Sequence, residues 1–213
     1  MNVLNLLAKI VFPERRQANP FVVEFCGYCG VGKSFLNKKL RSKFSRHIFG
    51  INNCLKFFRV LKMSYTPEMR EVIDYFSDKD LCNHYKKILD WSVKARCNNR
   101  NFYIDEAFSA FPPTLLKGFY KDRPDLFKKF YKNTIIIYLY DTPERIFERD
   151  RKRYEMGKRS APTYKDANFS FKGFEEQMKW LENFVPVLWV DASLPLDKRI
   201  KLCRDFIQKY IDR

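Results

Sequence analysis

The chain has 213 residues, a length that suits one α/β domain with a substantial core. Hydrophobic residues make up 46% of it and aromatic residues 17%, which argues against disorder, and no apolar run is long enough for a transmembrane helix. The 41 Lys and Arg residues exceed the 25 Asp and Glu residues and give a formal charge of +16, which favours polyanionic partners such as ATP, nucleic acid or anionic lipid.

Residues 1–20 form an N-terminal extension before the first predicted strand. Its apolar side chains predict a short helix packed on the domain. The alternative is a contact with an anionic membrane surface or a partner, helped by Arg15 and Arg16. The extension lacks the basic start and the small-residue cleavage site of a signal peptide, so we expect a cytoplasmic protein.

A glycine-rich loop follows the first strand. Residues 21–26 predict that strand and residues 33–47 a helix, and Gly27–Ser34 between them fits G-x-x-x-x-G-K-[ST], the nucleotide-binding P-loop. In such a loop, backbone N–H groups surround a phosphate chain, the lysine reaches the β- and γ-phosphates, and the hydroxyl binds Mg²⁺. The residues expected to bind ATP are Gly27, Gly30, Val31, Gly32, Lys33, Ser34 and Phe35.

Cys26 and Cys29 form a C-x-x-C pattern that overlaps this loop. The same pattern between a strand and a helix is typical of dithiol redox sites. The Gly32-Lys33-Ser34 sequence has no role in such chemistry, however, so we interpret the cysteines as free thiols in a reducing compartment.

The remaining elements alternate between strand and helix. Along the chain the sequence predicts a short strand at 55–62, helices at 67–76 and 79–97, a strand at 102–105, helices at 112–120 and 123–132, a strand at 134–139, a helix from Thr142, a strand at 187–190 and a closing helix at 196–211. Apolar strands separated by helices predict an α/β, three-layer P-loop NTPase fold, with a parallel sheet flanked by helices in a single domain spanning 1–213.

Two acids close the 102–105 strand. Asp105 and Glu106 are predicted at the carboxyl edge of the sheet, where the P-loop also lies. A carboxylate there can hold Mg²⁺, together with Ser34, or accept the proton of an attacking hydroxyl. Asp105 is nearer the strand and is the better candidate for the metal, and Glu106 for the base, but the two roles remain open.

An arginine-rich segment follows the 134–139 strand. Arg145, Arg149 and Arg153 are spaced four apart, hence on one helix face. A phosphotransferase must offset the charge of the phosphoryl group in transfer, and arginines on a mobile segment can do so. We therefore predict a lid at about 145–165, with Arg149 and Arg153 as its catalytic residues. The alternative is an exposed helix whose own acids pair with the arginines.

Together these features are similar to a known family. The chain resembles the thymidylate kinase-like branch of P-loop nucleoside and nucleotide kinases over residues 21 to about 211. The resemblance is carried by Gly27–Ser34, by Ile104–Ser109, by Asp141–Glu144 followed by Arg149 to Gly157, and by Trp189–Ser193 before the terminal helix. It implies an ATP- and Mg²⁺-dependent kinase in which Ser34 and Asp105 hold the metal.

One departure concerns the acceptor. The family has an Asp-Arg pair where this chain has Asp105-Glu106, and an acid suits a neutral hydroxyl better than a phosphate. The acceptor is therefore expected to be a nucleoside, a nucleotide-like molecule, a sugar or another small alcohol. The alternatives are a polynucleotide 5′-kinase and a nucleotide-binding interaction protein at an anionic membrane. A second copy of the chain, forming a homodimer, is a further candidate partner.

Overall fold

The computed structural model describes residues 20–28, 31–44, 48–50, 65–97, 101–105, 107–157 and 164–211. The expectations that lie outside these ranges are the extension up to residue 19, the strand at 55–62, Gly30 and Glu106.

The described residues form a five-stranded sheet with the order β2-β3-β1-β4-β5. All four strand pairs are parallel, which confirms the predicted parallel sheet. The strands are β1 (Val22–Cys26), β2 (Ile48–Gly50), β3 (Asn101–Asp105), β4 (Thr134–Tyr140) and β5 (Val187–Asp191).

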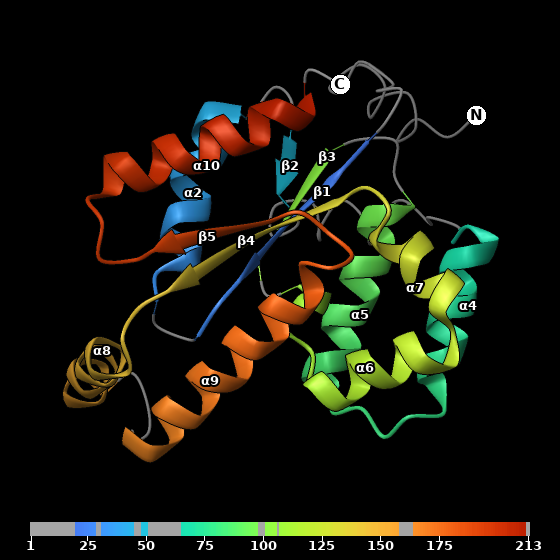
Figure 1. Ribbon diagram of the computed structural model, residues 1–213, viewed down its shortest axis with the longest axis horizontal. Helices are drawn as coiled ribbons and strands as arrows, with labels where there is room; N and C mark the ends of the chain where they lie inside the picture. The colour runs from blue at the N-terminus through green and yellow to red at the C-terminus, as the bar shows by residue number, and fades with distance from the viewer. Residues whose placement is uncertain are drawn as a thin grey trace.

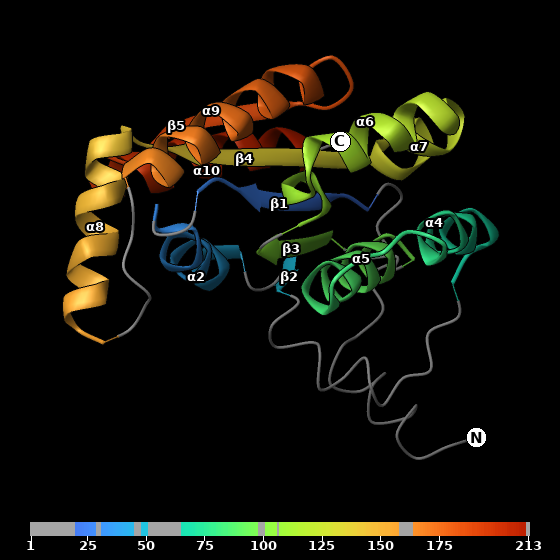
Figure 2. The same ribbon diagram turned by 90° about the horizontal axis from the view of Figure 1, so that it is seen from below.

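Helices cover both faces of this sheet. They are α2 (Lys33–Phe44), α4 (Pro67–Ser77), α5 (Asn83–Arg96), the 3₁₀ turn η1 (Phe108–Ala110), α6 (Pro113–Asp122), α7 (Pro124–Tyr131), α8 (Pro143–Glu155), α9 (Tyr164–Leu181) and α10 (Leu196–Ile211). Figure 1 shows α2 and α10 on one face, and α4 to α7 with α9 on the other. Helix α8 stands beyond the carboxyl end of β4, where it contacts α9 (Figures 1 and 2).

The alternation of side chains along β1 explains the two layers. Val23 and Phe25 belong to the core under α2 and α10, whereas Cys26 belongs to the larger aromatic core under α4 to α7 and α9. Every β1 residue is buried, which is typical of a central strand covered on both faces. Glu24 shares the face of Cys26 and is fully buried, so this strand carries a charge into the core.

Two of the predicted helix starts are confirmed in atomic detail. The hydroxyl of Thr66 accepts a hydrogen bond from the Met69 N–H at 3.3 Å, and Pro67 is the first residue of α4. The hydroxyl of Thr142 accepts the Arg145 N–H at 3.3 Å at the start of α8. Each cap satisfies an N–H group that has no partner within the helix.

Helix α9 was not predicted from the sequence. Gly173 lies inside it, and glycine disfavours a helix interior by about 1 kcal/mol relative to alanine. The helix is stabilised by tertiary contacts instead, because Met178 and Leu181 are fully buried in the aromatic core. Helix α2 is described from Lys33 to Phe44, residues 45–47 of the predicted helix lie outside the described ranges, and the edge strand β2 follows.

Candidate phosphate-binding site

The loop after β1 has a backbone that requires glycine. Gly27 has a φ of +135°, and a Cβ there would lie 2.2 Å from the carbonyl oxygen of Leu139. The end of β1 therefore approaches the β4 backbone too closely for any side chain. Gly32 has a φ of +98°, which L-residues rarely adopt. Both glycines of the motif are thus explained by geometry.

Lys33 extends back over this loop. Its ammonium donates hydrogen bonds to the carbonyl oxygens of Gly27, at 2.7 Å, and Tyr28, at 3.0 Å. The carbonyl of Gly32 accepts the Leu36 N–H at 3.1 Å, so α2 begins directly at the loop. A lysine cation and a helix N-terminus therefore converge at one place, which favours an anion.

The other predicted loop residues differ in exposure. Val31 is buried in the core shared with α2 and α10. Ser34 is exposed, and Phe35 beside it has 52% of its surface exposed. The hydroxyl of Ser34 is thus accessible to a ligand, and so is the aromatic ring of Phe35.

Asp105 reaches the same edge of the sheet. It is the last residue of β3 and pairs with Phe25 of β1, two residues before Gly27. Its Oδ1 atom is buried and has no hydrogen-bond partner among the described residues. A buried carboxylate oxygen without a donor is costly unless a ligand supplies one. Mg²⁺ prefers such oxygens, so Asp105 fits the expected metal.

The arginine-rich helix α8 is tied to the end of β4. The buried carboxylate of Asp141 contacts the guanidinium of Arg149 and lies 3.5 Å from that of Arg145. Arg153 is paired with Asp150 instead, at 3.8 Å. The predicted face of arginines therefore exists, but Asp141 holds two of its members and the third has a separate partner.

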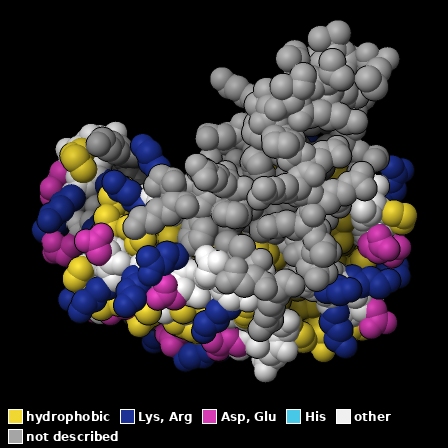
Figure 3. Space-filling view, turned by 90° about the horizontal axis from the view of Figure 1, so that it is seen from above, with side chains coloured by type: hydrophobic (Ala, Val, Ile, Leu, Met, Phe, Trp, Pro, Cys, Tyr) yellow, Lys and Arg dark blue, Asp and Glu magenta, His cyan; other side chains and the backbone are white. Residues whose placement is uncertain are grey.

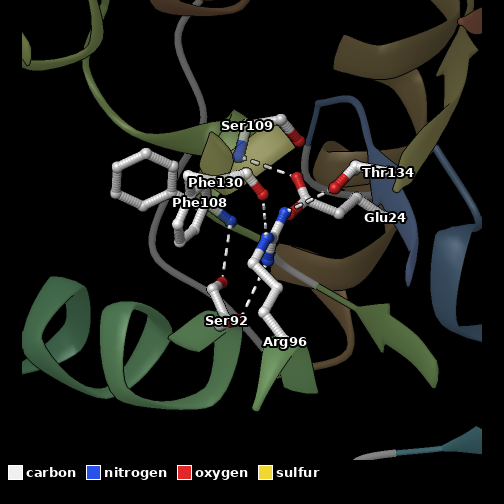
Figure 4. A network of polar contacts seen from close by, with 7 residues as sticks. All are labelled: Glu24, Ser92, Arg96, Phe108, Ser109, Phe130 and Thr134. Carbon is white, nitrogen blue, oxygen red and sulfur yellow. Dashed lines mark hydrogen bonds and ion pairs between the residues drawn. The ribbon is translucent and has the colours of Figure 1, made fainter. Parts of the chain in front are cut away.

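A buried ion pair lies on the face of β1 that α4 to α7 and α9 cover (Figure 4). Glu24 accepts a hydrogen bond from the Arg96 guanidinium of α5 at 2.6 Å. The remaining donors of that guanidinium bind the carbonyls of Ser92 and Phe130, at 2.9 and 2.7 Å, and the hydroxyl of Thr134, at 3.0 Å. The pair is well satisfied, so it can be buried at a tolerable cost.

The Glu24 carboxylate also binds the segment that follows Asp105. The second oxygen of Glu24 accepts the backbone N–H of Ser109 in η1 at 3.0 Å. The carbonyls of Ser109 and Phe111 both accept the side-chain amide of Gln177 on α9. The P-loop strand, the segment after the acidic pair and α9 are thus connected by buried hydrogen bonds.

Sequence reasoning gave no role to Glu24, Arg96, Gln177 or Asp141. An acid inside an otherwise apolar strand was the available signal for Glu24, because a buried charge requires a partner. The partners themselves could not be identified, since Arg96 is 72 residues away along the chain.

Cys26 is in an environment that disfavours redox chemistry. Its thiol is fully buried, and burial raises its pKa from 9.0 to about 11. Thiol–disulfide exchange requires the thiolate, which is scarce at neutral pH when the pKa is this high. The geometry therefore supports the interpretation that Cys26 has no redox role.

The positive charge is spread over the described part of the face drawn in Figure 3. Figure 3 shows Lys and Arg side chains interspersed with Asp and Glu over the described part of the face drawn. Within the described ranges, no helix is both long and apolar enough to cross a bilayer.

Comparison of the sequence with known proteins gives no match. No protein-family model matches the chain, and no curated protein sequence does so significantly.

Comparison of the structure does give matches. The YorR protein of Bacillus subtilis, solved with phosphorylated GDP bound, is similar with a TM-score of 0.51 and 15% identity, over 88% of this chain and 95% of that one. Two other similar structures have TM-scores below 0.5. A deoxyadenosine kinase from M. mycoides, solved with dCMP and dCDP, has a TM-score of 0.49 at 19% identity, over 89% of this chain and 100% of that one. A gluconokinase from Sinorhizobium meliloti has a TM-score of 0.46 at 14% identity, over 92% of this chain and 99% of that one.

The first of these matches shows the fold. At 15% identity it shows nothing beyond the fold, but it extends over nearly the whole length of both chains. Together with the parallel sheet between two helical layers, it confirms the predicted α/β architecture.

Proposed function

We propose that the protein is an ATP- and Mg²⁺-dependent phosphotransferase that moves the γ-phosphate to a hydroxyl of a small acceptor. The observation that carries this proposal is the arrangement at the carboxyl edge of the sheet. There the Lys33 ammonium lies over the P-loop carbonyls, and Asp105 has a buried oxygen without a donor. A cation and a carboxylate at one sheet edge suit a phosphate chain with its metal.

The donor half consists of the loop and the start of α2. We propose that the backbone around Gly27, Gly30 and Gly32 surrounds the phosphates. The Lys33 ammonium exchanges its two carbonyl acceptors for β- and γ-phosphate oxygens, which offer negative charge in place of dipoles. The Ser34 hydroxyl and Asp105 would hold Mg²⁺. When bound, that ion offsets the charge that develops on the β- and γ-oxygens.

The acceptor half consists of the acidic pair and the arginine-rich helix. A carboxylate of Glu106 or Asp105 takes the proton of the acceptor hydroxyl while that oxygen attacks the γ-phosphorus. The bond from this phosphorus to the β-bridging oxygen breaks, and ADP leaves. In this proposal Arg149 and Arg153 offset the negative charge on the transferring group.

Arg149 must change its partner for this step. It is bound to Asp141 in the structure, and its side chain is 36% exposed. A partly exposed arginine exchanges a carboxylate for a phosphate at low cost, because both acceptors suit its planar guanidinium. We therefore propose that α8 and the residues up to about 165 serve as a lid.

The test is transfer of labelled γ-phosphate from ATP and GTP to a panel of nucleosides, nucleotides and sugars. GTP is included because the similar YorR structure holds a guanine nucleotide. Oligonucleotides with a 5′-hydroxyl are included because the charge of +16 attracts polyanions, and steep salt dependence would favour a polynucleotide 5′-kinase.

The matched variants are Asp105→Asn and Asp90→Asn. Asp90 is a half-buried acid on α5 that is paired with Lys94 at 2.8 Å. We expect Asp105→Asn to lower turnover roughly 100-fold or more and Asp90→Asn to leave it nearly unchanged. Nucleotide binding without transfer to any acceptor would contradict the enzyme proposal and favour a nucleotide-binding interaction protein.

A further inference from the structure

Arg199 lies beside the P-loop although it is distant in sequence. It belongs to the first turn of α10, and its Nη1 atom is 3.9 Å from the position that a Cβ on Gly32 would occupy. Helices α10 and α2 share one core, in which Ile200 and Leu36 are both buried. The backbone N–H of Arg199 donates to the Pro195 carbonyl at 3.1 Å. The guanidinium is therefore placed by the core of the domain and not by a lid.

This guanidinium has no acceptor in the described part of the chain. The Nε atom of Arg199 is buried without a hydrogen-bond partner, and no described carboxylate lies within ion-pair distance. The nearby carboxylate of Asp191 instead accepts the Ser193 N–H at 2.7 Å. An arginine with a buried and unsatisfied donor is costly unless something supplies an acceptor.

The arginines of α8 differ from Arg199 in their ion pairs. Arg145 and Arg149 are paired with Asp141, and Arg153 is paired with Asp150. Arg199 differs because its guanidinium has no ion-pair partner among the described residues and because it lies directly against the loop. Its rigid set of N–H donors matches the oxygens of a phosphate group.

We infer that Arg199 is a donor-site residue whose guanidinium binds phosphate oxygens of the nucleotide held by the P-loop. This inference rests on the proposed function, since it requires a phosphate chain in the loop. It adds a second cation, beside Gly32, to the Lys33 ammonium at the Gly27 and Tyr28 carbonyls. Because α10 is part of the core, Arg199 can act before any movement of α8.

The experiment is calorimetric titration of ATP, inorganic tripolyphosphate and adenosine into the wild type and three variants. The variants are Arg199→Gln, Arg199→Lys and, as the matched control, Arg204→Gln. Arg204 lies on the same helix but is 46% exposed and paired with Asp205 at 2.9 Å. Thermal unfolding without ligand checks that each variant is folded.

We expect Arg199→Gln to weaken binding of both ATP and tripolyphosphate by roughly 10- to 100-fold, the loss typical of a hydrogen bond to a charged group. Arg199→Lys should recover part of this affinity, because it keeps the charge but loses the planar fork. Arg204→Gln should bind both ligands as the wild type does. Adenosine should not distinguish the four proteins.

Two results would overturn the assignment. The first is wild-type affinity of Arg199→Gln for both ATP and tripolyphosphate, which would leave the proposed function standing without Arg199. The second is a loss confined to ATP and adenosine, which would place Arg199 at the base. If the wild type bound neither ATP, GTP nor tripolyphosphate, the proposed function itself would fail and the assignment with it.

Discussion

Glu24 of β1 and Asp141 directly after β4 each pair with an arginine. The two pairs differ in the solvent exposure and the partners of that arginine. Glu24 and Asp141 both have buried carboxylates. The side chain of Arg96, which pairs with Glu24, is 6% exposed, whereas that of Arg149, which pairs with Asp141, is 36% exposed. The acids are thus equally protected from water, and only the arginines distinguish the two sites.

The partners of each arginine explain this difference. Arg96 binds Glu24, two carbonyls and the Thr134 hydroxyl, and its guanidinium stacks on the Phe130 ring at 3.8 Å from the centroid. Moving it would break all of these contacts together. Arg149 has Asp141 as its acidic partner and also faces solvent. The first pair is therefore suited to fix the fold and the second to release an arginine to a ligand.

Breaking the buried pair should have the largest effect. Arg96→Met leaves Glu24 charged in the core, and we expect a loss of about 3–5 kcal/mol in the free energy of unfolding. Urea titration measures it. The control is Arg151→Met on α8, whose half-exposed partner Glu148 is 3.4 Å away, and we expect a change below about 0.5 kcal/mol. Equal losses for the two variants would contradict the structural role of Arg96.

Removing the exposed arginine should affect turnover more than stability. We expect Arg149→Ala to lower the rate of phosphate transfer roughly 100- to 1,000-fold, because charge on the transferring group is no longer offset. Its free energy of unfolding should fall by no more than about 1 kcal/mol. Arg151→Ala, on the same helix, should keep wild-type turnover. Wild-type turnover in Arg149→Ala would show that Arg149 has no catalytic role.

Salt should distinguish the two pairs. We expect Asp141→Asn to lower the free energy of unfolding by about 1–2 kcal/mol, because its partners are partly exposed and the asparagine oxygen can still accept the Thr142 N–H. This loss should shrink in 1 M NaCl, since exposed charges are screened, whereas the loss in Arg96→Met should persist. Urea titrations at two salt concentrations measure both, and an unscreened loss in Asp141→Asn would remove the contrast.

The smallest expected effect concerns how the free energy of unfolding depends on pH through Cys26 of β1. The pKa of Cys26 is about 11 in the folded protein against 9.0 when unperturbed, mainly because of burial. A raised folded pKa contributes stability that is fully present below pH 9 and is lost as pH rises through 11. At pH 10 the wild type should lose about 1 kcal/mol that Cys26→Ala does not lose. Equal pH dependence of the two proteins would show that Cys26 titrates normally.

The backbone geometry of the proposed donor half was predictable because its information is local. The strand, the P-loop motif and the helix lie within residues 22–44, and both motif glycines have the positive φ angles that favour glycine. The caps at Thr66 and Thr142 are local in the same sense. The position of Asp105 at the loop edge followed from the rule that parallel strands place their carboxyl ends together.

The partners could not be predicted because they depend on packing between distant segments. Nothing near Glu24 identifies Arg96, and nothing near Gly32 identifies Arg199, since helices α5 and α10 bring them there. Helix α9 was missed because Gly173 disfavours a helix interior, although Phe174, Met178 and Leu181 recur at helical spacing and pack in the aromatic core. Local patterns thus predicted the backbone geometry of the loop, but not which side chains hold the surrounding segments.

The most direct measurement is the transfer of labelled γ-phosphate by the wild type, Lys33→Ala and Lys38→Ala with a reactive acceptor. Lys38 is the matched control, because it is exposed on the same helix α2. We predict that Lys33→Ala loses transfer by roughly 1,000-fold or more while Lys38→Ala retains it. Equal transfer by Lys33→Ala and the wild type would contradict the assignment of the P-loop as the donor site.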